Sequence, residues 1–286
     1  MIIENEFTIR KFAKKHVHRL RASNSLWDVI ELMNDFQIRH IPIVEGMTLK
    51  GVINPTSLMH ALQNYTDPST FDQSAGDFVS DEYILVHDDD SVLNIIDTIA
   101  KSNGKLCAIL MSDGIFHGIF TEEDILTNDY LWSQLMDHRI SSDTKIGRSI
   151  HEFSCIPSHM PIQHALRLMS SFNTEVVGII DEHSKVLVGA LSFMDIVRYL
   201  MFHYKELNTE IDFLWRTSIN TIFPEAGLYI SENTLLSDLR QQLYNTSSYL
   251  GILLNEENYP TRMISVHDII NLYVDSSGFP ISNTWE

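Results

Sequence analysis

Apolar positions along this chain follow two spacings, and the two alternate in a fixed order. Apolar residues at positions 26, 29, 30 and 33 recur at the spacing of one helix face, which predicts an amphipathic helix. The run from Ile41 to Val44 predicts a buried strand, and Leu49 to Ile53 predicts a second strand after the turn at Glu45-Gly46. The remaining expected elements of this stretch are a lead-in helix from Ile9 to Lys15, a strand from Val17 to Arg21 and a closing helix from Thr56 to Tyr65.

The same β-α-β-β-α layout of about 60 residues returns three more times. The helices of these copies show apolar stripes at Val92, Ile95, Ile96 and Ile99, at Ile162, Ala165, Leu166 and Met169, and at Leu235, Leu236, Leu239 and Leu243. Their paired strands are expected at Leu106–Met111 and Ile115–Phe120, at Glu175–Ile180 and Val186–Leu191, and at Tyr249–Leu254 and Arg262–Ile264. The dipeptide Asp113-Gly114 is a strong signal for a tight hairpin turn.

Two landmarks keep step through the four copies. The helix starts at Leu26, Val92, Ile162 and Leu235 are 66, 70 and 73 residues apart, and the last strands end at intervals of 67, 71 and 73 residues. A period this long is typical of small domains rather than of a solenoid. We therefore expect four units, at residues 1–66, 74–133, 146–205 and 217–276, with the polar segment Thr127–Ser149 as a connector.

Each last strand ends in a similar short motif. In the stretch Gly118-Ile-Phe-Thr121-Glu-Glu-Asp124, the strand ends on the hydroxyl residue Thr121. The acid Asp124 follows three positions later, in the first turn of the next helix. Ser192 with Asp195 and Ser265 with Asp268 repeat this arrangement, whereas unit 1 has Asn54 and Ser57. Free N–H groups at such a helix start favour an anion. The alternative is a capping box, and Ser25 with Asp28 has the same spacing.

Composition narrows the function classes. Net charge is −18 over 286 residues, which argues against nucleic acid or an anionic membrane as partner. No apolar run approaches the roughly 20 residues of a membrane span. Cys107 and Cys155 lie in apolar runs, as buried thiols of a reducing compartment do. We expect a soluble, cytoplasmic protein.

No catalytic or metal-binding motif accompanies the repeats. The thirteen histidines form no H-E-x-x-H pattern, and no C-x-x-C, G-x-S-x-G, P-loop or G-x-G-x-x-G is present. We expect neither an enzyme nor a metal site.

The unit layout, with G-h-h-[ST]-x-x-D at its end, resembles the CBS domain over nearly the whole chain. The resemblance implies an α/β (α+β) fold in which units pair as Bateman modules, here residues 1–133 and 140–286, packed as a disc. It also implies that apolar helix faces such as Leu26/Met33 and Leu235/Leu243 are covered within the pairs. Four units in one chain are similar to the γ subunit of AMP-activated protein kinase and to stand-alone prokaryotic proteins.

The resemblance also implies a site in each cleft between paired units. Its acid accepts hydrogen bonds from ribose, its hydroxyl residue meets phosphate or sugar, and adenine lies against apolar strand residues of the paired unit. The implied ligand-binding residues are Asp124, Thr121, Arg39, His40, Val17, Ile41, Asp195, Ser192, Asp268 and Ser265.

The positive charge expected near each motif ranks the four sites for phosphate binding. Phosphate needs positive charge, and the resemblance implies that it comes from the start of the paired unit's central strand. For Asp124 that place is Arg39-His40, supported by Lys15, His16 and Arg19. Alternatively, Arg39 and His40 complement the preceding helix end. The corresponding places are Ser248-Tyr249 for Asp195, Glu175-Val176 for Asp268 and Lys105 for Ser57. We expect Asp124 to mark the best nucleotide site, and Ser57 the emptiest.

The main hypothesis is a regulatory sensor that binds AMP, ADP or ATP as ligand, needs no cofactor, and acts on a regulated protein or as a homodimer. Two alternatives stay open. One is a scaffold whose clefts have lost their ligand, and the other is a sensor of S-adenosylmethionine or adenosine.

Overall fold

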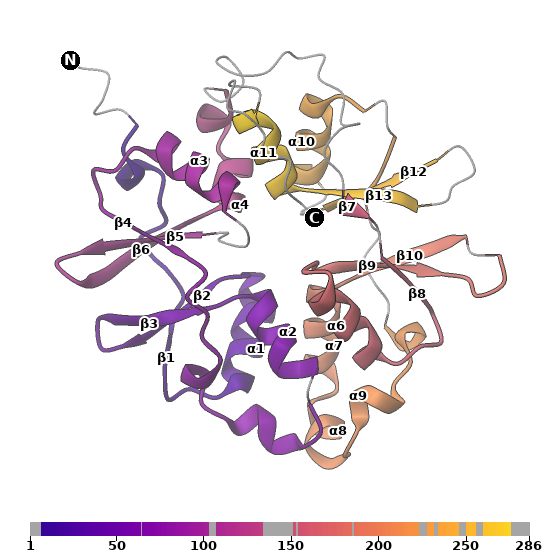
Figure 1. Ribbon diagram of the computed structural model, residues 1–286. Coiled ribbons are helices and arrows are strands. Elements are labelled where there is room, and N and C mark those ends of the chain that lie inside the picture. Colours follow the sequence, from indigo (N-terminus) through magenta and orange to yellow (C-terminus); the bar gives the residue numbers. More distant parts are fainter. Residues whose placement is uncertain are drawn as a thin grey trace.

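The computed structural model describes residues 7–63, 65–102, 107–133, 151–152, 154–184, 186–222, 228–231, 234–245, 250–255 and 260–275. Figure 1 shows four units arranged around a centre, with the sheets of units 1 and 2 on the left and those of units 3 and 4 on the right. This arrangement agrees with the disc of two Bateman modules that the resemblance to the CBS domain implies.

Unit 1 contains each element of the predicted layout. Its elements are η2 (Ile9–Lys11), β1 (Leu20–Arg21), α1 (Leu26–Phe36), β2 (Ile41–Glu45), β3 (Thr48–Ile53) and α2 (Pro55–Gln63), followed by the 3-10 turns η3 (Pro68–Asp72) and η4 (Ala75–Phe78). Unit 2 contains β4 (Ile84–Val86), α3 (Val92–Lys101), β5 (Cys107–Ser112), β6 (Ile115–Thr121) and α4 (Glu122–Thr127).

Units 3 and 4 repeat the order. Unit 3 contains β7 (His151–Glu152), β8 (Cys155–Pro157), α6 (Ile162–Ser171), β9 (Val176–Ile180), β10 (Leu187–Ser192) and α7 (Phe193–Phe202). Next come α8 (Tyr204–Thr209), α9 (Phe213–Arg216) and η5 (Ile219–Thr221), then unit 4 with β11 (Leu228–Ile230), α10 (Leu236–Asn245), β12 (Leu250–Leu254), β13 (Pro260–Ser265) and α11 (Val266–Asp275).

Local sequence explains where these elements begin and turn. Helix α1 starts after Ser25, whose Oγ accepts a hydrogen bond from the Asp28 N–H at 3.1 Å. The β5–β6 hairpin turns at Asp113 and Gly114, which both have positive φ, as the Asp-Gly signal predicts. In each unit the strand before the long first helix (β1, β4, β8 and β11) lies parallel to the next strand, which in turn lies antiparallel to the last strand.

Units 1 and 2 pair by exchanging their lead segments, the stretches that precede β1 and β4. Lys14 pairs with Ile119 of β6 through two backbone hydrogen bonds of 2.9 and 3.0 Å. Ser80 pairs reciprocally with Val52 of β3 at 2.8 and 3.1 Å. Both partners lie two residues before the start of the motif, which is Thr121 in unit 2 and Asn54 in unit 1. The exchange is therefore symmetric, and it confirms the pairing of units 1 and 2.

The second module shows one half of the same exchange. Strand β7, which leads into unit 3, pairs with β13 of unit 4, and His151 lies opposite Met263. Met263 again lies two residues before the strand end at Ser265. The lead into unit 4 falls on residues 223–227, outside the described residues.

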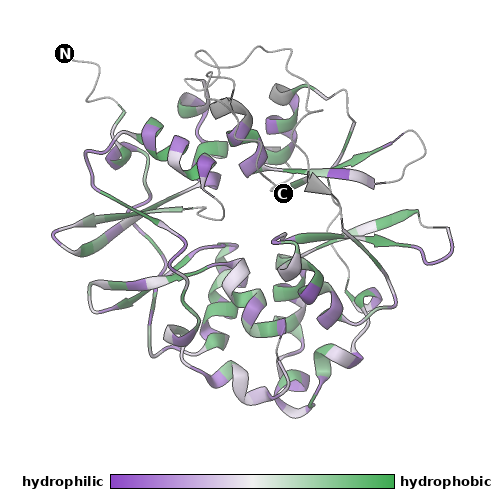
Figure 2. Ribbon diagram, viewed as in Figure 1, coloured by the Kyte–Doolittle hydropathy of each residue, from purple (hydrophilic) through white to green (hydrophobic). Residues whose placement is uncertain are grey.

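The sheets and the helices pack against different neighbours. The sheets of units 1 and 2 enclose a small core that includes Val52, Cys107 and Phe116. The helices pack between modules instead: one core joins units 1 and 3, and another joins units 2 and 4. In Figure 1 these helical layers lie at the bottom and the top, and Figure 2 shows apolar residues recurring along them.

This packing corrects one expectation. Leu26 and Met33 are buried in the core shared with unit 3, and Leu243 in the core shared with unit 2. Their apolar faces are therefore covered between modules rather than within a pair, and in units 1 and 2 the sheets form the core within the pair.

Two boundaries also differ from the sequence expectation. Only Ile9–Lys11 of the lead-in helix is helical, and only Leu20–Arg21 of the next strand is paired with β2, because Lys14 pairs with β6. The segment expected to connect the modules begins inside the fold, since Leu131 and Trp132 are buried in the core of units 2 and 4. Residues 134–150 lie outside the described residues. No helix in the described part of the chain is both long and apolar enough to cross a bilayer.

Gly51 tests the lead-segment exchange. A Cβ at this position would lie 2.7 Å from Val79 Cβ and 3.0 Å from the Ser80 carbonyl oxygen. We expect Gly51→Ala to lower the free energy of unfolding by about 1–3 kcal/mol through this overlap, measured by urea unfolding. Thr48→Ala, at an exposed position on the same strand, should change it by less than about 0.5 kcal/mol. An unfolding midpoint for Gly51→Ala equal to that of the control would contradict the close approach.

Candidate ligand-binding cleft

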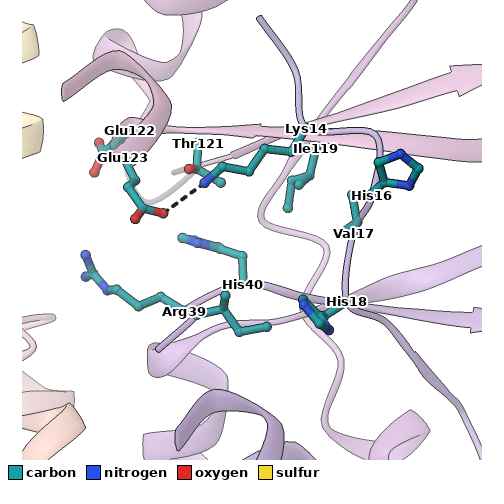
Figure 3. Close-up of a pocket in the computed structure, with 11 residues that line it drawn as sticks. Lys14, His16, Val17, His18, Arg39, His40, Ile119, Thr121, Glu122 and Glu123 are labelled. Carbon is teal, nitrogen blue, oxygen red and sulfur yellow. Dashed lines mark hydrogen bonds and ion pairs between the residues drawn. The ribbon is translucent and has the colours of Figure 1, made fainter. Parts of the chain in front are cut away.

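A cleft lies between units 1 and 2, where the exchanged lead segment crosses the end of β6. Its walls are Lys14 and His16–His18 of the lead segment, Ile38–His40 before β2, Ile119, and Thr121–Glu123 at the start of α4. Figure 3 shows Lys14 extending across the cleft toward the start of α4, with Arg39 and His40 on the opposite wall. The enclosed volume is about 90 Å³, which is below the usual range of small-molecule sites, and the cleft is partly open to solvent.

Asp124 uses its two carboxylate oxygens differently. Oδ2 accepts hydrogen bonds from the Thr121 N–H at 2.8 Å and from the Thr121 hydroxyl at 3.1 Å, which closes a capping box at the start of α4. Oδ1 lies 3.0 Å from Lys14 Nζ. The capping interpretation of the motif is therefore confirmed for one oxygen, while the other oxygen faces a cation.

Lys14 bridges two acids at the edge of the cleft. Its Nζ also lies 3.1 Å from Glu123 Oε2, and about half of its side chain is exposed. Burial lowers the pKa of Lys14, but the charges of Asp124 and Glu123 outweigh burial and raise the pKa overall. Burial raises the pKa of Asp124, against the opposing effects of Lys14 and Thr121. Asp124 itself is 7% exposed and lies behind Lys14, Thr121 and Glu123 rather than among the residues that line the cleft.

The opposite wall carries Arg39 and His40. Arg39 forms an ion pair through Nη2 with Glu175 Oε2 of unit 3, and both side chains are largely buried. This partner belongs to neither sequence hypothesis, since it is neither a ligand nor the end of α1. His40 is half-buried with its Nε2 buried and without a hydrogen-bond partner among the described residues. Burial, with Arg39 and Lys14 nearby, lowers the pKa of His40 to about 3, so its ring is neutral.

Of the other residues predicted for this cleft, some line it and others do not. Val17 and His16 line the cleft, whereas Lys15 and Arg19 are exposed and do not. Ile41 is fully buried in the core of units 1 and 3, and Ile38 lines the cleft in its place.

In the unit 3 motif, both carboxylate oxygens of Asp195 are paired with residues of its own unit. Asp195 Oδ2 accepts from the Ser192 N–H at 2.9 Å and from its hydroxyl at 2.6 Å. Asp195 Oδ1 lies 3.2 Å from Arg198 Nη1, one turn further along α7. A cation of the same helix thus takes the place that Lys14 takes at Asp124.

Unit 4 closes the same cap, and unit 1 closes it without a carboxylate, since the Asn54 N–H donates to Ser57 Oγ at 3.1 Å. Asp268 Oδ2 accepts from the N–H and the hydroxyl of Ser265, both at 2.7 Å. In unit 1 the Asn54 side-chain oxygen accepts from the Ser57 N–H at 2.8 Å, and the Ser57 hydroxyl donates to the Asn54 carbonyl at 3.1 Å. No carboxylate remains there for a sugar.

Register identifies the position that corresponds to Lys14 in each cleft. Lys14 lies opposite the residue two before the end of β6, and the equivalent residues are Ser80 for Ser57 and His151 for Asp268. Lys14 is therefore specific to the Asp124 cleft among the three. Ser248, Tyr249 and Lys105, which were expected to serve the other clefts, lie outside the described residues.

Sequence reasoning missed two features near the Asp124 cleft. It named Lys15 rather than Lys14, because the register of the lead segment depends on a strand more than 100 residues away. It also missed the pair between Glu122 and His267 Nδ1, 2.6 Å apart, which joins the helix starts of units 2 and 4. Within the described residues, no three His, Cys, Asp or Glu side chains gather as a metal site.

The Lys14–Asp124 pair has a consequence for pH dependence. Lys14→Met removes the cation that opposes the burial of Asp124, so we expect the pKa of Asp124 to rise further. A carboxyl with a raised folded-state pKa takes up protons on folding. The free energy of unfolding of the variant should therefore fall more steeply than that of the wild type as pH rises from about 3.8 to the folded-state pKa.

Urea unfolding across that pH window measures this effect. Lys15→Met, a matched change at the exposed neighbour, should follow the wild type. Adding Asp124→Asn to Lys14→Met should remove the extra pH dependence. Equal pH slopes for Lys14→Met and Lys15→Met would show that the pair does not control the carboxyl.

Comparisons with known proteins agree with this architecture. A curated relative, described as an uncharacterized 33.4 kDa protein in a ribosomal RNA operon of Thermofilum pendens, is 22% identical over 134 residues. That match covers 44% of this chain and 44% of the relative's length. Among solved structures, protein MJ1225 from Methanocaldococcus jannaschii, described as a proposed archaeal homologue of g-AMPK, has a TM-score of 0.81 at 13% identity, covering 93% of this chain and 99% of that one.

An uncharacterized conserved protein from Pyrococcus horikoshii has a TM-score of 0.59 at 12% identity, with coverage of 93% and 99%. The model of the CBS domain family matches residues 9–64, 75–129 and 147–202, which correspond to units 1, 2 and 3. Unit 4 repeats their strand order in its own sheet. The chain therefore belongs to the CBS-domain family, with four CBS units in two Bateman modules.

Proposed function

We propose that this protein is a regulatory sensor that binds an adenine nucleotide (AMP, ADP or ATP) in the cleft between units 1 and 2. The observation that carries the proposal is the carboxylate of Asp124, capped on one side and paired with Lys14 on the other. A nucleotide presents a sugar diol and anionic phosphates together. At this cleft Asp124 is the acceptor for the diol, and Lys14 and Arg39 are the cations for the phosphates.

Binding is an exchange of partners. A ribose hydroxyl donates to Asp124 Oδ1 in place of Lys14, and the released ammonium group then serves a phosphate. Lys14 is suited to this exchange because half of its side chain is exposed and its stem is flexible. Val17, Ile38 and Ile119 supply apolar surface for the base. Thr121 keeps Asp124 oriented while the exchange takes place.

The other clefts rank below this one. The acid of Asp195 is held by Arg198, Ser57 replaces the acid in unit 1, and Glu175 stands at the expected phosphate position for Asp268. An uncharged ligand such as adenosine suits the Asp268 cleft better than a nucleotide does. Occupancy passes to a regulated protein or to a second copy of the chain, and the likeness to MJ1225 supports energy sensing as the setting.

Titration calorimetry with adenosine, AMP, ADP and ATP tests the proposal. Asp124→Asn removes the charge but keeps the shape, and hydrogen bonds to a charged acceptor contribute about 1.5–3 kcal/mol. We expect all four ligands to bind roughly 10- to 100-fold more weakly. Arg39→Met should weaken ADP and ATP more than adenosine, because only phosphates reach it.

Asp195→Asn and Asp268→Asn are the matched controls, since they change the same group in the other motifs. They should leave the tightest nucleotide site unchanged. If Asp268→Asn abolished binding of AMP, ADP and ATP while Asp124→Asn preserved it, the assignment of the site would be wrong.

A further inference from the structure

The ion pair between Arg39 and Glu175 joins equivalent positions of the two modules. Ile41 lies opposite Ile53, the residue before Asn54 of the motif, and Val177 lies opposite Leu191, the residue before Ser192 of the unit 3 motif. Counting back two residues from each gives Arg39 in unit 1 and Glu175 in unit 3. The same structural position thus carries opposite charges in the two modules, and the charges meet where the modules pack.

Arg39 takes part in two contacts at once. It lines the cleft between units 1 and 2, and it pairs with Glu175 across the interface between units 1 and 3. The side chains are 17% and 19% exposed, so water screens the pair only in part. Charge that enters the cleft near Arg39 therefore acts on the contact between modules.

We propose that Glu175 determines the phosphate specificity of the Asp124 cleft from the opposite module, by competing with ligand phosphate for Arg39. This inference rests on the proposed function, since it concerns the same cleft. A phosphate either draws Arg39 away from Glu175 or stays close to the Glu175 carboxylate and is repelled by it. Both routes make phosphate binding and the contact between units 1 and 3 mutually unfavourable.

Among the described cations that line the cleft, Lys14 is paired within the first module, whereas Arg39 is paired with a residue of the second module. Lys14 is already shared by Asp124 and Glu123, Glu122 is paired with His267, and His40 is neutral. Adenosine has no phosphate and leaves the Arg39–Glu175 pair intact. Because coupling between two binding events is reciprocal, a ligand that Glu175 disfavours must in turn weaken the contact that Glu175 makes. The cleft thereby converts phosphate occupancy into a change at the interface between modules.

Calorimetric titration of the full chain with adenosine and with ADP tests this inference. Glu175→Gln removes the competing charge, so we expect ADP to bind at least about fivefold more tightly, with adenosine changed less than about twofold. Arg39→Met in the Glu175→Gln background should abolish the gain. Glu182→Gln, the same change at an exposed position of unit 3, should behave as the wild type. Glu175→Thr provides a second neutral variant should Glu175→Gln fail to fold.

Thermal unfolding gives a second, reciprocal readout. The single and double variants at Arg39 and Glu175 form a cycle, and the coupling between the two residues should be smaller in saturating ADP than in saturating adenosine. An unchanged ratio of ADP to adenosine affinity in both neutral variants would overturn the inference while leaving nucleotide binding in place. Failure of the wild type to bind either ligand would overturn both the inference and the proposed function.

Discussion

The exchange of lead segments between paired units is the constraint on which the rest of the structure depends. Lys14 pairs with β6 and Ser80 with β3, each through two backbone hydrogen bonds. At Gly51 and Gly118 the approach is so close that a Cβ would meet the crossing backbone at 3.0 and 3.1 Å. This pairing fixes which residue of one unit stands over the motif of the other. A slip of one residue would turn Lys14 away from Asp124, because side chains alternate along an extended segment.

Charge in the Asp124 cleft is balanced internally before any ligand arrives. Lys14 is paired with Asp124 and Glu123, Arg39 with Glu175, and His40 is neutral. The ligand binding that we propose, in a chain with net charge −18, is therefore an exchange of partners rather than the filling of a positive pocket. The exchange has two distinct ends. At the Lys14 end it stays within one module, and at the Arg39 end it reaches the other module.

Local pattern was sufficient to predict the units, and long-range pairing decided the site. The spacing of apolar residues predicts α1 and β2 closely, and Asp113-Gly114 predicts the hairpin turn. The capping of Thr121 by Asp124 also follows from local sequence. The choice of Lys14 over Lys15 depends on register against a distant strand. The Arg39–Glu175 pair depends on how two modules pack, and neither is encoded within one repeat.

A crystal structure of the protein with ADP tests the central claim most directly. We expect the nucleotide in the cleft between units 1 and 2, with its ribose hydroxyls on Asp124 Oδ1 and Lys14 moved from Asp124 toward the phosphates. ADP bound at the Asp195 or Asp268 motif, with the Lys14–Asp124 pair intact and the first cleft empty, would contradict the account.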